Sequence, residues 1–228
     1  MHQEFESREQ AASAAAEIIR QAVERRLAAT DEATVVLSGG TSPLGVFAEL
    51  TAMELPWERL HVTLSDERWV SADHEDSNER MLYDTLLGQG DARDATFLPL
   101  YEADTDVDAR SETLSQQIRL LPFPFACALL GMGEDGHFAS LFPDADNLAA
   151  GLDTENPDLV IPVRTAASPH LRVSLTLSAL SRSDAVVLLI FGEKKLEVLN
   201  AAIEDPDRYP VGTLLRQKRA PVHVLWAP

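Results

Sequence analysis

Hydrophobic positions along this chain follow two patterns, which together predict an α/β fold. Short, continuously apolar runs rich in β-branched residues predict buried strands of a parallel sheet, at 33–38, 60–65, 125–131 and 185–192. Amphipathic segments lie between these runs and predict helices, at 7–29, 43–53, 77–87, 106–120, 193–203 and 212–217. Strands that alternate with helices at this spacing indicate a three-layer, open, mostly parallel α/β sheet with helices on both faces.

Four weaker segments complete the expected strands. Residues 96–100 predict a short or edge strand, and residues 158–163 and 221–228 predict two more. Residues 171–177 alternate apolar and polar positions, which favours an antiparallel or one-sided strand. Because no repeat, low-complexity tract or Ser/Gly linker interrupts the sequence, we expect a single domain over residues 1–228.

Composition narrows the classes of partner. The formal net charge of −18 argues against binding to nucleic acid or to an anionic membrane, which needs a basic surface. No run approaches the roughly 18 apolar residues of a membrane-spanning helix. The single cysteine, Cys127, fits a reducing, cytoplasmic compartment, and its apolar surroundings indicate a buried small hydrophobe rather than a catalytic thiol. Since only 19 residues are cationic, an anionic ligand requires several of them to converge in loops.

Three polar loops follow predicted strands, two of them with glycines, and ligands of open α/β sheets bind where such loops converge. The first loop is LSGGTSP at 37–43. Gly39 and Gly40 allow the backbone to approach a ligand, Thr41 and Ser42 supply hydroxyls, and Ser42 with the next proline suits the start of a helix. This loop is either an anion site at a helix N-terminus or an ordinary βα turn. It is not a Walker A loop, because no Gly-Lys-Ser/Thr follows.

The second loop is SDERWV at 65–70, extended by HEDSN at 74–78. Asp66, Glu67 and Arg68 stand at a strand end, where Arg68 could bind a phosphate or carboxylate through two parallel hydrogen bonds. The alternative is a salt-bridged surface loop. The histidine of HEDSN is flanked by acids and reads as a solvated residue.

The third loop contains G-x-G-x-x-G at 131–136, the pattern of a dinucleotide-binding turn. That reading requires a helix that starts among the glycines, and Pro143 stops any long helix soon after them. The loop instead displays His137 with Asp135 two residues away, which suits a general base whose tautomer a carboxylate fixes. The alternative is a hydrogen-bonded structural histidine. A metal site is disfavoured because no H-E-x-x-H or Cys/His cluster accompanies the loop, and a G-x-S-x-G nucleophile elbow is absent.

Taken together, the three loops resemble the 6-phosphogluconolactonase family, which shares its fold with glucosamine-6-phosphate deaminase and ribose-5-phosphate isomerase. The resemblance continues at 171–177, 191–195 and 207–215. It implies a sugar-phosphate isomerase-like, modified Rossmann fold. Asp66-Glu67-Arg68 and the SLFP of 140–143 resemble the lactonase branch, because the deaminases carry Asp-Glu-Tyr and Phe-Asn-Glu-Pro there.

Two positions depart from the lactonase pattern. Phe138 stands where threonine is common, and Lys194 stands where glycine is common. The second departure leaves Lys195 as the better match to the lysine of the family.

This resemblance implies hydrolysis of 6-phospho-D-glucono-1,5-lactone to 6-phosphogluconate, in the oxidative pentose phosphate pathway, without a metal or organic cofactor. His137 is then the base for water, oriented by Asp135 or Asp66. The implied substrate-binding residues are the loop and the nearby polar and cationic side chains: Gly39, Gly40, Thr41, Ser42, Asn78, and some of Arg68, Arg172 and Lys195. An alternative role for Arg68 is to polarise the carbonyl. We expect a monomer or weak homodimer.

Two other functions are alternatives to the lactonase. An aldose–ketose isomerase or deaminase of sugar phosphates would use Asp66 as its proton-transfer base. A non-catalytic sugar-phosphate sensor would be expected to lose the motif histidine or aspartate, yet His137, Asp135 and Asp66 are all present.

Overall fold

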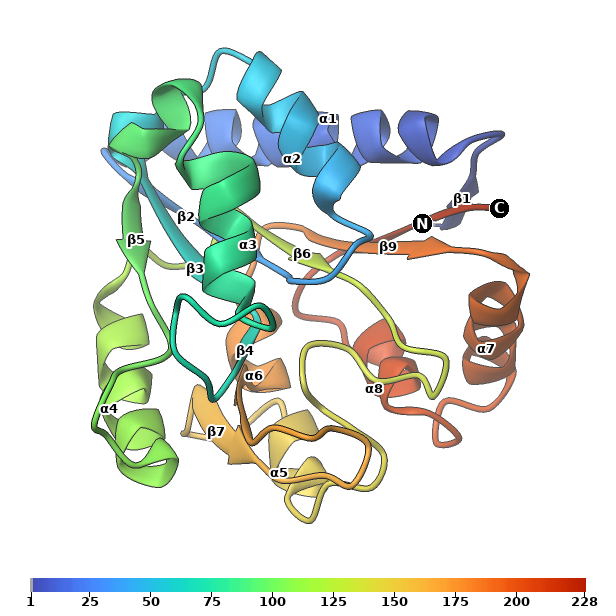
Figure 1. The fold of residues 1–228 in the computed structure, drawn as a ribbon. Helices are drawn as coiled ribbons and strands as arrows, with labels where there is room; N and C mark the ends of the chain where they lie inside the picture. Colours follow the sequence, from blue (N-terminus) through green and yellow to red (C-terminus); the bar gives the residue numbers. More distant parts are fainter. Residues whose placement is uncertain (1) are drawn as a thin grey trace.

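Seven parallel strands form the central sheet of the computed structural model, which describes residues 2–228 (Figure 1). Their order across the sheet is β1 (His2–Glu4), β10 (Val222–Ala227), β9 (Val186–Phe191), β6 (Cys127–Leu130), β2 (Ala33–Leu37), β3 (Leu60–Leu64) and β5 (Thr96–Leu98). Every residue of β2 and β6 is buried, as expected of strands that are covered on both faces. The predicted apolar runs thus form the middle of the sheet.

Helices cover both faces of this sheet. On one face, α1 (Arg8–Leu27) contacts α2 (Leu44–Ala52) and strands β2, β6, β9 and β10 (Figure 1). The buried side of α1 consists mostly of alanines, whose small side chains let the helix lie close to the strands. On the other face, α7 (Glu193–Glu204) contacts β9 and packs beside α8 (Pro210–Arg216). The predicted three-layer, mostly parallel α/β fold is confirmed.

A second, three-stranded sheet lies on the α7 side of the molecule and corrects one part of the prediction. Its order is β4 (Asp66–Arg68), β8 (Arg172–Leu175) and β7 (Val160–Val163), with both pairs antiparallel. It sits with α4 (Val107–Leu120), α5 (Leu148–Leu152) and α6 (Leu177–Leu180) below the central sheet in Figure 1. The DER stretch was expected as loop. It becomes a strand because it pairs with β8, a distant partner that no local pattern shows.

The ends of two helices bear on the site. α3 (Asn78–Leu82) continues through a π-helical turn to Leu87, as predicted, and the Ser77 hydroxyl caps its start. The expected Ser42 cap is wrong, because α2 begins at Leu44 and Pro43 occupies the N-cap position. Within residues 2–228 no side chain caps α2. The Leu44 N–H donates to the Thr41 carbonyl over 3.4 Å, and in the described chain the N–H groups of Gly45 and Val46 remain available to other acceptors.

The single cysteine lies in the core, as predicted, and no helix of the described residues is suited to a membrane. Cys127 is fully buried in β6, and burial raises the pKa of its thiol to about 12, so it acts as a small hydrophobe. Among residues 2–228, no helix has both the length and the apolar character that crossing a bilayer requires.

Candidate active site

A cavity of about 390 Å³ opens at the carboxyl ends of β2, β3 and β6. From β2 the chain continues to β3 and β5 on one side, then crosses to β6, β9 and β10 on the other. The loops after β2 and β6 therefore diverge and leave a crevice, as at the switch points of other open sheets. The cavity is lined by all the predicted site residues except Asp135: Gly39, Gly40, Thr41, Ser42, Asp66, Arg68, Asn78, His137, Arg172 and Lys195.

Asp135 lies behind the cavity wall and holds His137. The distance from His137 Nδ1 to Asp135 Oδ1 is 2.5 Å. Because a carboxylate only accepts, Nδ1 carries the proton, and Nε2 is left as the basic nitrogen. Within residues 2–228 no hydrogen bond engages Nε2. The imidazole also packs against the Phe142 ring, with centroids 4.1 Å apart.

The two glycines that follow Gly131 in the motif shape this arrangement. Gly136 has φ +76, and the Gly136 N–H donates to the Gly133 carbonyl over 3.1 Å. A side chain at Gly133 would collide with the His137 ring, so glycine there lets the imidazole lie against the loop. The glycines serve a strand-end turn, and no helix starts among them, as Pro143 predicted.

The Asp135 carboxylate is ionised in this setting. Partial burial alone would raise its pKa, but the hydrogen bond and charge of His137 outweigh burial and lower the pKa below its usual value. An ionised Asp135 would therefore stabilise a positive charge on the neighbouring imidazole ring.

Asp66, the other carboxylate considered as a partner of His137, is buried among different groups. The hydroxyls of Ser140 and Ser65 donate to its oxygens over 2.6 and 2.8 Å, and Arg172 Nη1 lies 3.6 Å away. Asp135 is therefore the carboxylate that contacts the imidazole. Ser140 was not singled out by the sequence, although it lies in the motif loop.

Arg68 and Arg172 stand directly opposite each other in the β4–β8 pair. Arg68 Nη1 donates to the Asp76 carbonyl over 2.6 Å, and Arg172 Nε donates to Ser168 Oγ over 2.9 Å. Arg68 Nε is buried, with no hydrogen-bond partner in the described chain. Burial lowers the pKa of Arg172, and the charge of Arg68 lowers it further, although Asp66 opposes both. Like charges opposite one another in a sheet repel, so an anion between them would stabilise the pair.

The glycine loop and Lys195 form another part of the cavity. Asn78 Nδ2 donates to the Asp66 carbonyl over 2.9 Å, and its side chain fills the space that a Cβ at Gly39 would need. Lys195 is half-buried, and that burial lowers the pKa of its ammonium group. Lys194 instead pairs on the surface with Glu134 at 2.6 Å. The structure thus brings Lys195, and not Lys194, to the cavity.

Glu67 has a role that the sequence did not reveal. Its fully buried carboxylate accepts the N–H groups of Arg68, Asn78 and Glu79 over 2.7–2.8 Å, and the Ser77 hydroxyl over 3.3 Å. Burial raises its pKa to about 7, although these N–H groups oppose the shift. Glu67 therefore ties β4 to the start of α3 and holds Arg68 and Asn78 in place.

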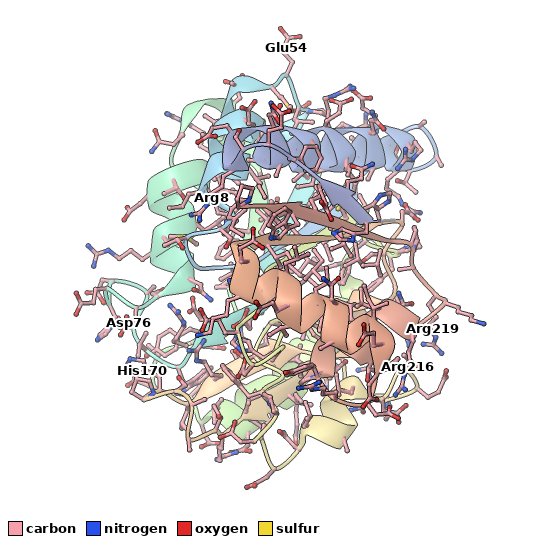
Figure 2. The ribbon with its side chains drawn as sticks, turned by 90° about the vertical axis from the view of Figure 1, so that its right-hand side faces the viewer. Arg8, Glu54, Asp76, His170, Arg216 and Arg219 are labelled. Carbon is pink, nitrogen blue, oxygen red and sulfur yellow. The ribbon has the colours of Figure 1, made fainter. Side chains whose placement is uncertain are left out.

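The segment that follows β4 and the segment that precedes β8 also meet at the surface. His170 Nε2 and Asp76 Oδ2 are 2.9 Å apart, and the two residues lie close together in Figure 2. The His74 ring packs edge-on against His170, with centroids 5.6 Å apart. Within residues 2–228, no group of three or more metal-ligating side chains is arranged to hold a metal ion.

Known proteins resemble this chain over nearly its whole length. A family model described as glucosamine-6-phosphate isomerases/6-phosphogluconolactonase matches residues 6–226. Curated 6-phosphogluconolactonases of Mesorhizobium japonicum and Caulobacter vibrioides are 37% and 39% identical over 98% of this chain, covering 94% and 95% of the relatives. A 6-phosphogluconolactonase structure from Shewanella baltica has a TM-score of 0.94 at 32% identity, covering 100% of this chain and 97% of that one. A monomeric glucosamine-6-phosphate deaminase, at 17% identity and a TM-score of 0.76, shares the fold.

Proposed function

Because the chain belongs to the glucosamine-6-phosphate isomerase/6-phosphogluconolactonase family, we propose that it hydrolyses 6-phospho-D-glucono-1,5-lactone to 6-phosphogluconate, with His137 activating the water. The chain is an enzyme of the lactonase kind, a hydrolase that acts on an ester bond. The observation that carries the mechanism is the His137–Asp135 contact, which directs a basic nitrogen toward a cavity rich in cations.

In the first step, His137 Nε2 accepts a proton from water while the water oxygen attacks C1 of the lactone. The carbonyl electrons move to oxygen and form a tetrahedral oxyanion. The imidazolium is stabilised by the ionised Asp135, 2.5 Å from Nδ1. A positive guanidinium facing the cavity, from Arg68 or Arg172, supplies charge for the oxyanion.

In the second step, the oxyanion reforms the carbonyl and the bond from C1 to the ring oxygen O5 breaks. The Nε2 proton passes to O5, which restores neutral His137 and opens the ring. The product acid then loses its proton to solvent. No redox partner is needed, because water supplies both the new C–O bond and the protons.

The substrate carries a phosphate, and the cavity supplies groups suited to it. We propose that the 39–42 loop binds the phosphate with some of Arg68, Arg172 and Lys195, while Asn78 fixes the loop. The buried Ser38 hydroxyl, which has no hydrogen-bond partner in the described chain, lines the same wall and supports this assignment.

The test is an assay of the purified protein with freshly generated 6-phosphogluconolactone, set against spontaneous hydrolysis in the same buffer. Glucosamine 6-phosphate and a pentose phosphate serve as substrates for the competing isomerase or deaminase activities. We expect acceleration of lactone hydrolysis only. Hydrolysis at the spontaneous rate would exclude the lactonase, and turnover of glucosamine 6-phosphate would favour the deaminase.

A further inference from the structure

Residues 207–215 carry part of the family resemblance, yet none of them lines the active-site cavity. They form the end of the turn before α8 and most of that helix. Figure 1 shows α8 beside the loop that follows β6, which is the loop that carries the Asp135–His137 pair. The contact between these two segments therefore bears on the geometry of the pair.

Gly136 is the single residue between Asp135 and His137, so its backbone angles set how the two side chains face each other. Its φ of +76 is one of many conformations open to a glycine. Two hydrogen bonds within the loop restrain it, from the Gly136 N–H to the Gly133 carbonyl over 3.1 Å and from the Gly133 N–H to the His137 carbonyl over 2.9 Å. Neither of them engages the Gly136 carbonyl.

Two contacts from the start of α8 hold Gly136 from outside the loop. The Val211 N–H donates to the Gly136 carbonyl over 3.0 Å. The Tyr209 side chain lies directly against the Gly136 Cα, because a Cβ added to Gly136 would be only 2.6 Å from the Tyr209 Cβ. The backbone between the base and its carboxylate is thus fixed by residues about seventy positions later in the chain.

Tyr209 is itself placed by a tight turn. The Gly212 N–H donates to the Tyr209 carbonyl over 2.9 Å, and a Cβ at Gly212 would collide with the Pro206 backbone. The Arg208 guanidinium lies 5.3 Å from the centre of the Tyr209 ring. In the described chain the Tyr209 hydroxyl makes no hydrogen bond, so its contact with Gly136 depends on the carbon atoms of the side chain.

We propose that Tyr209 is a positioning residue for catalysis: by holding Gly136, it keeps the Asp135 carboxylate against His137 Nδ1. Tyr209 lies outside the active-site cavity and borders a separate hollow of about 440 Å³ between α5 and α8. It therefore acts on the reaction through His137 and not by contact with the substrate. The catalytic role of His137 rests on the proposed function, whereas the position of its ring proton can be observed without turnover.

The kinetic test compares Tyr209→Ala with Tyr209→Phe. Tyr209→Ala frees Gly136 and displaces the base, so it should lower kcat about 10- to 100-fold. Calorimetric affinity for 6-phosphogluconate should stay within about two-fold of wild type, because the cavity lining is unchanged. Tyr209→Phe keeps the ring and should retain about half or more of kcat. Wild-type kcat in Tyr209→Ala, or equal losses of kcat and affinity, would overturn the proposal.

The matched control is Tyr83→Ala, which removes a tyrosine at the far edge of the central sheet. Tyr83 is partly exposed and packs edge-on against Phe97 of the edge strand β5, with ring centres 5.5 Å apart. Tyr83→Ala should leave kcat unchanged. A loss of kcat in this control as large as that in Tyr209→Ala would assign Tyr209 a merely structural role and overturn the proposal.

Nitrogen NMR of the His137 ring, assigned by the signals that His137→Gln lacks, gives a readout independent of turnover. At about pH 8.5, above the ordinary titration range of histidine, wild type should carry the ring proton on Nδ1. In Tyr209→Ala part of the population should carry it on Nε2, because the carboxylate no longer selects one tautomer. The same Nδ1 tautomer in both proteins would overturn the proposal.

Two further outcomes remain decisive. If wild type failed to hydrolyse the lactone, the proposed function would fall, while the spectra would still decide whether Tyr209 positions the pair. If Tyr209→Ala did not fold, Tyr209→Leu, which keeps a smaller apolar side chain, would take its place in both measurements. Wild-type kcat and an unchanged tautomer in Tyr209→Leu would then overturn the proposal.

Discussion

The Nδ1 proton of His137 faces the Asp135 carboxylate, and the proposed mechanism depends on that orientation. In Asp135→Asn the amide can donate to Nδ1, which would move the ring proton to Nε2 and remove the base. We expect Asp135→Asn and His137→Ala to lower kcat by about 10²–10⁴-fold. Affinity for 6-phosphogluconate should stay within about three-fold of wild type. Initial rates above spontaneous hydrolysis give kcat, and calorimetry on the same preparations gives the affinity for 6-phosphogluconate. Parallel losses of rate and affinity would mean that the pair is structural.

Glu67 predicts how stability varies with pH. Burial raises its pKa to about 7 in the folded protein, against about 4.3 for an ordinary glutamate. A raised pKa means that the folded state binds the proton more tightly. The stabilising contribution of Glu67 to the free energy of unfolding is therefore fully present below about pH 4.3 and is lost as pH rises through 7.

The corresponding measurement is urea unfolding of wild type and Glu67→Gln between pH 4.5 and 8. Wild type should lose about 3 kcal/mol more unfolding free energy over this range than the variant, whose amide does not titrate. Repulsion among the other acids acts on both proteins and cancels in the comparison. Parallel stability curves would mean that Glu67 ionises in the folded state as it does in an unfolded chain.

Most residues of the cavity could be predicted because they carry recognisable chemistry close after strand ends, as Arg68 and His137 do. The role of Glu67 could not be predicted, because its partners are mainly backbone N–H groups, which the types of neighbouring residues do not reveal.

At the scale of elements, the segment that follows β4 and the segment that precedes β8 are joined by the Asp76–His170 hydrogen bond, 2.9 Å long. The backbone carbonyl of Asp76 accepts a hydrogen bond from Arg68. The Ser168 hydroxyl accepts a hydrogen bond from Arg172 and donates one to the His170 carbonyl over 3.1 Å. The Asp76–His170 hydrogen bond therefore links the residues that accept hydrogen bonds from Arg68 and from Arg172. The hydrogen bond from His170 lowers the pKa of Asp76, so the carboxylate stays ionised at neutral pH.

We expect Asp76→Asn and His170→Gln each to raise KM for 6-phosphogluconolactone about two- to five-fold, with little change in kcat, because a half-exposed pair contributes modestly. The double variant should resemble the single ones, since either removes the same pair. His61→Gln is the matched control. Its pair with Glu32, at 3.2 Å, lies at the amino ends of β2 and β3, away from the carboxyl ends that border the cavity. Additive effects of the two substitutions, or an equal effect in the control, would contradict the claim that the Asp76–His170 contact helps to position the two arginines.

Long elements were predictable because their periodicity repeats, as in α1 and α4. The second sheet was harder, since β4 has three residues and its register depends on β8, about one hundred residues later. α5 and α6, with five and four residues, are too short to show a helical period.

At the scale of the whole molecule, 37 acidic residues face 19 basic ones, so the folded surface repels itself. Its ion pairs are mostly exposed, as Arg164–Asp108 and Arg216–Asp207 are, and such pairs stabilise little. Raising KCl from 0.05 to 0.5 M shortens the screening length and should raise the free energy of unfolding by about 1 kcal/mol. Urea unfolding at several KCl concentrations measures this change in the free energy of unfolding. A steady loss of stability with salt would show that attractive pairs dominate instead.

The place of β10 has a consequence for the newly made chain. β10 is the last strand in the sequence, yet it lies between β1 and β9 and pairs with both. Until it arrives, β9 presents the edge VVLLIF, which carries no charge and no proline, and β1 has no neighbour in the sheet. Unprotected apolar edges recruit other strands, and aggregation during synthesis follows from such exposure. Val222–Ala227 thus cover an apolar strand edge that would otherwise be exposed in the nascent protein.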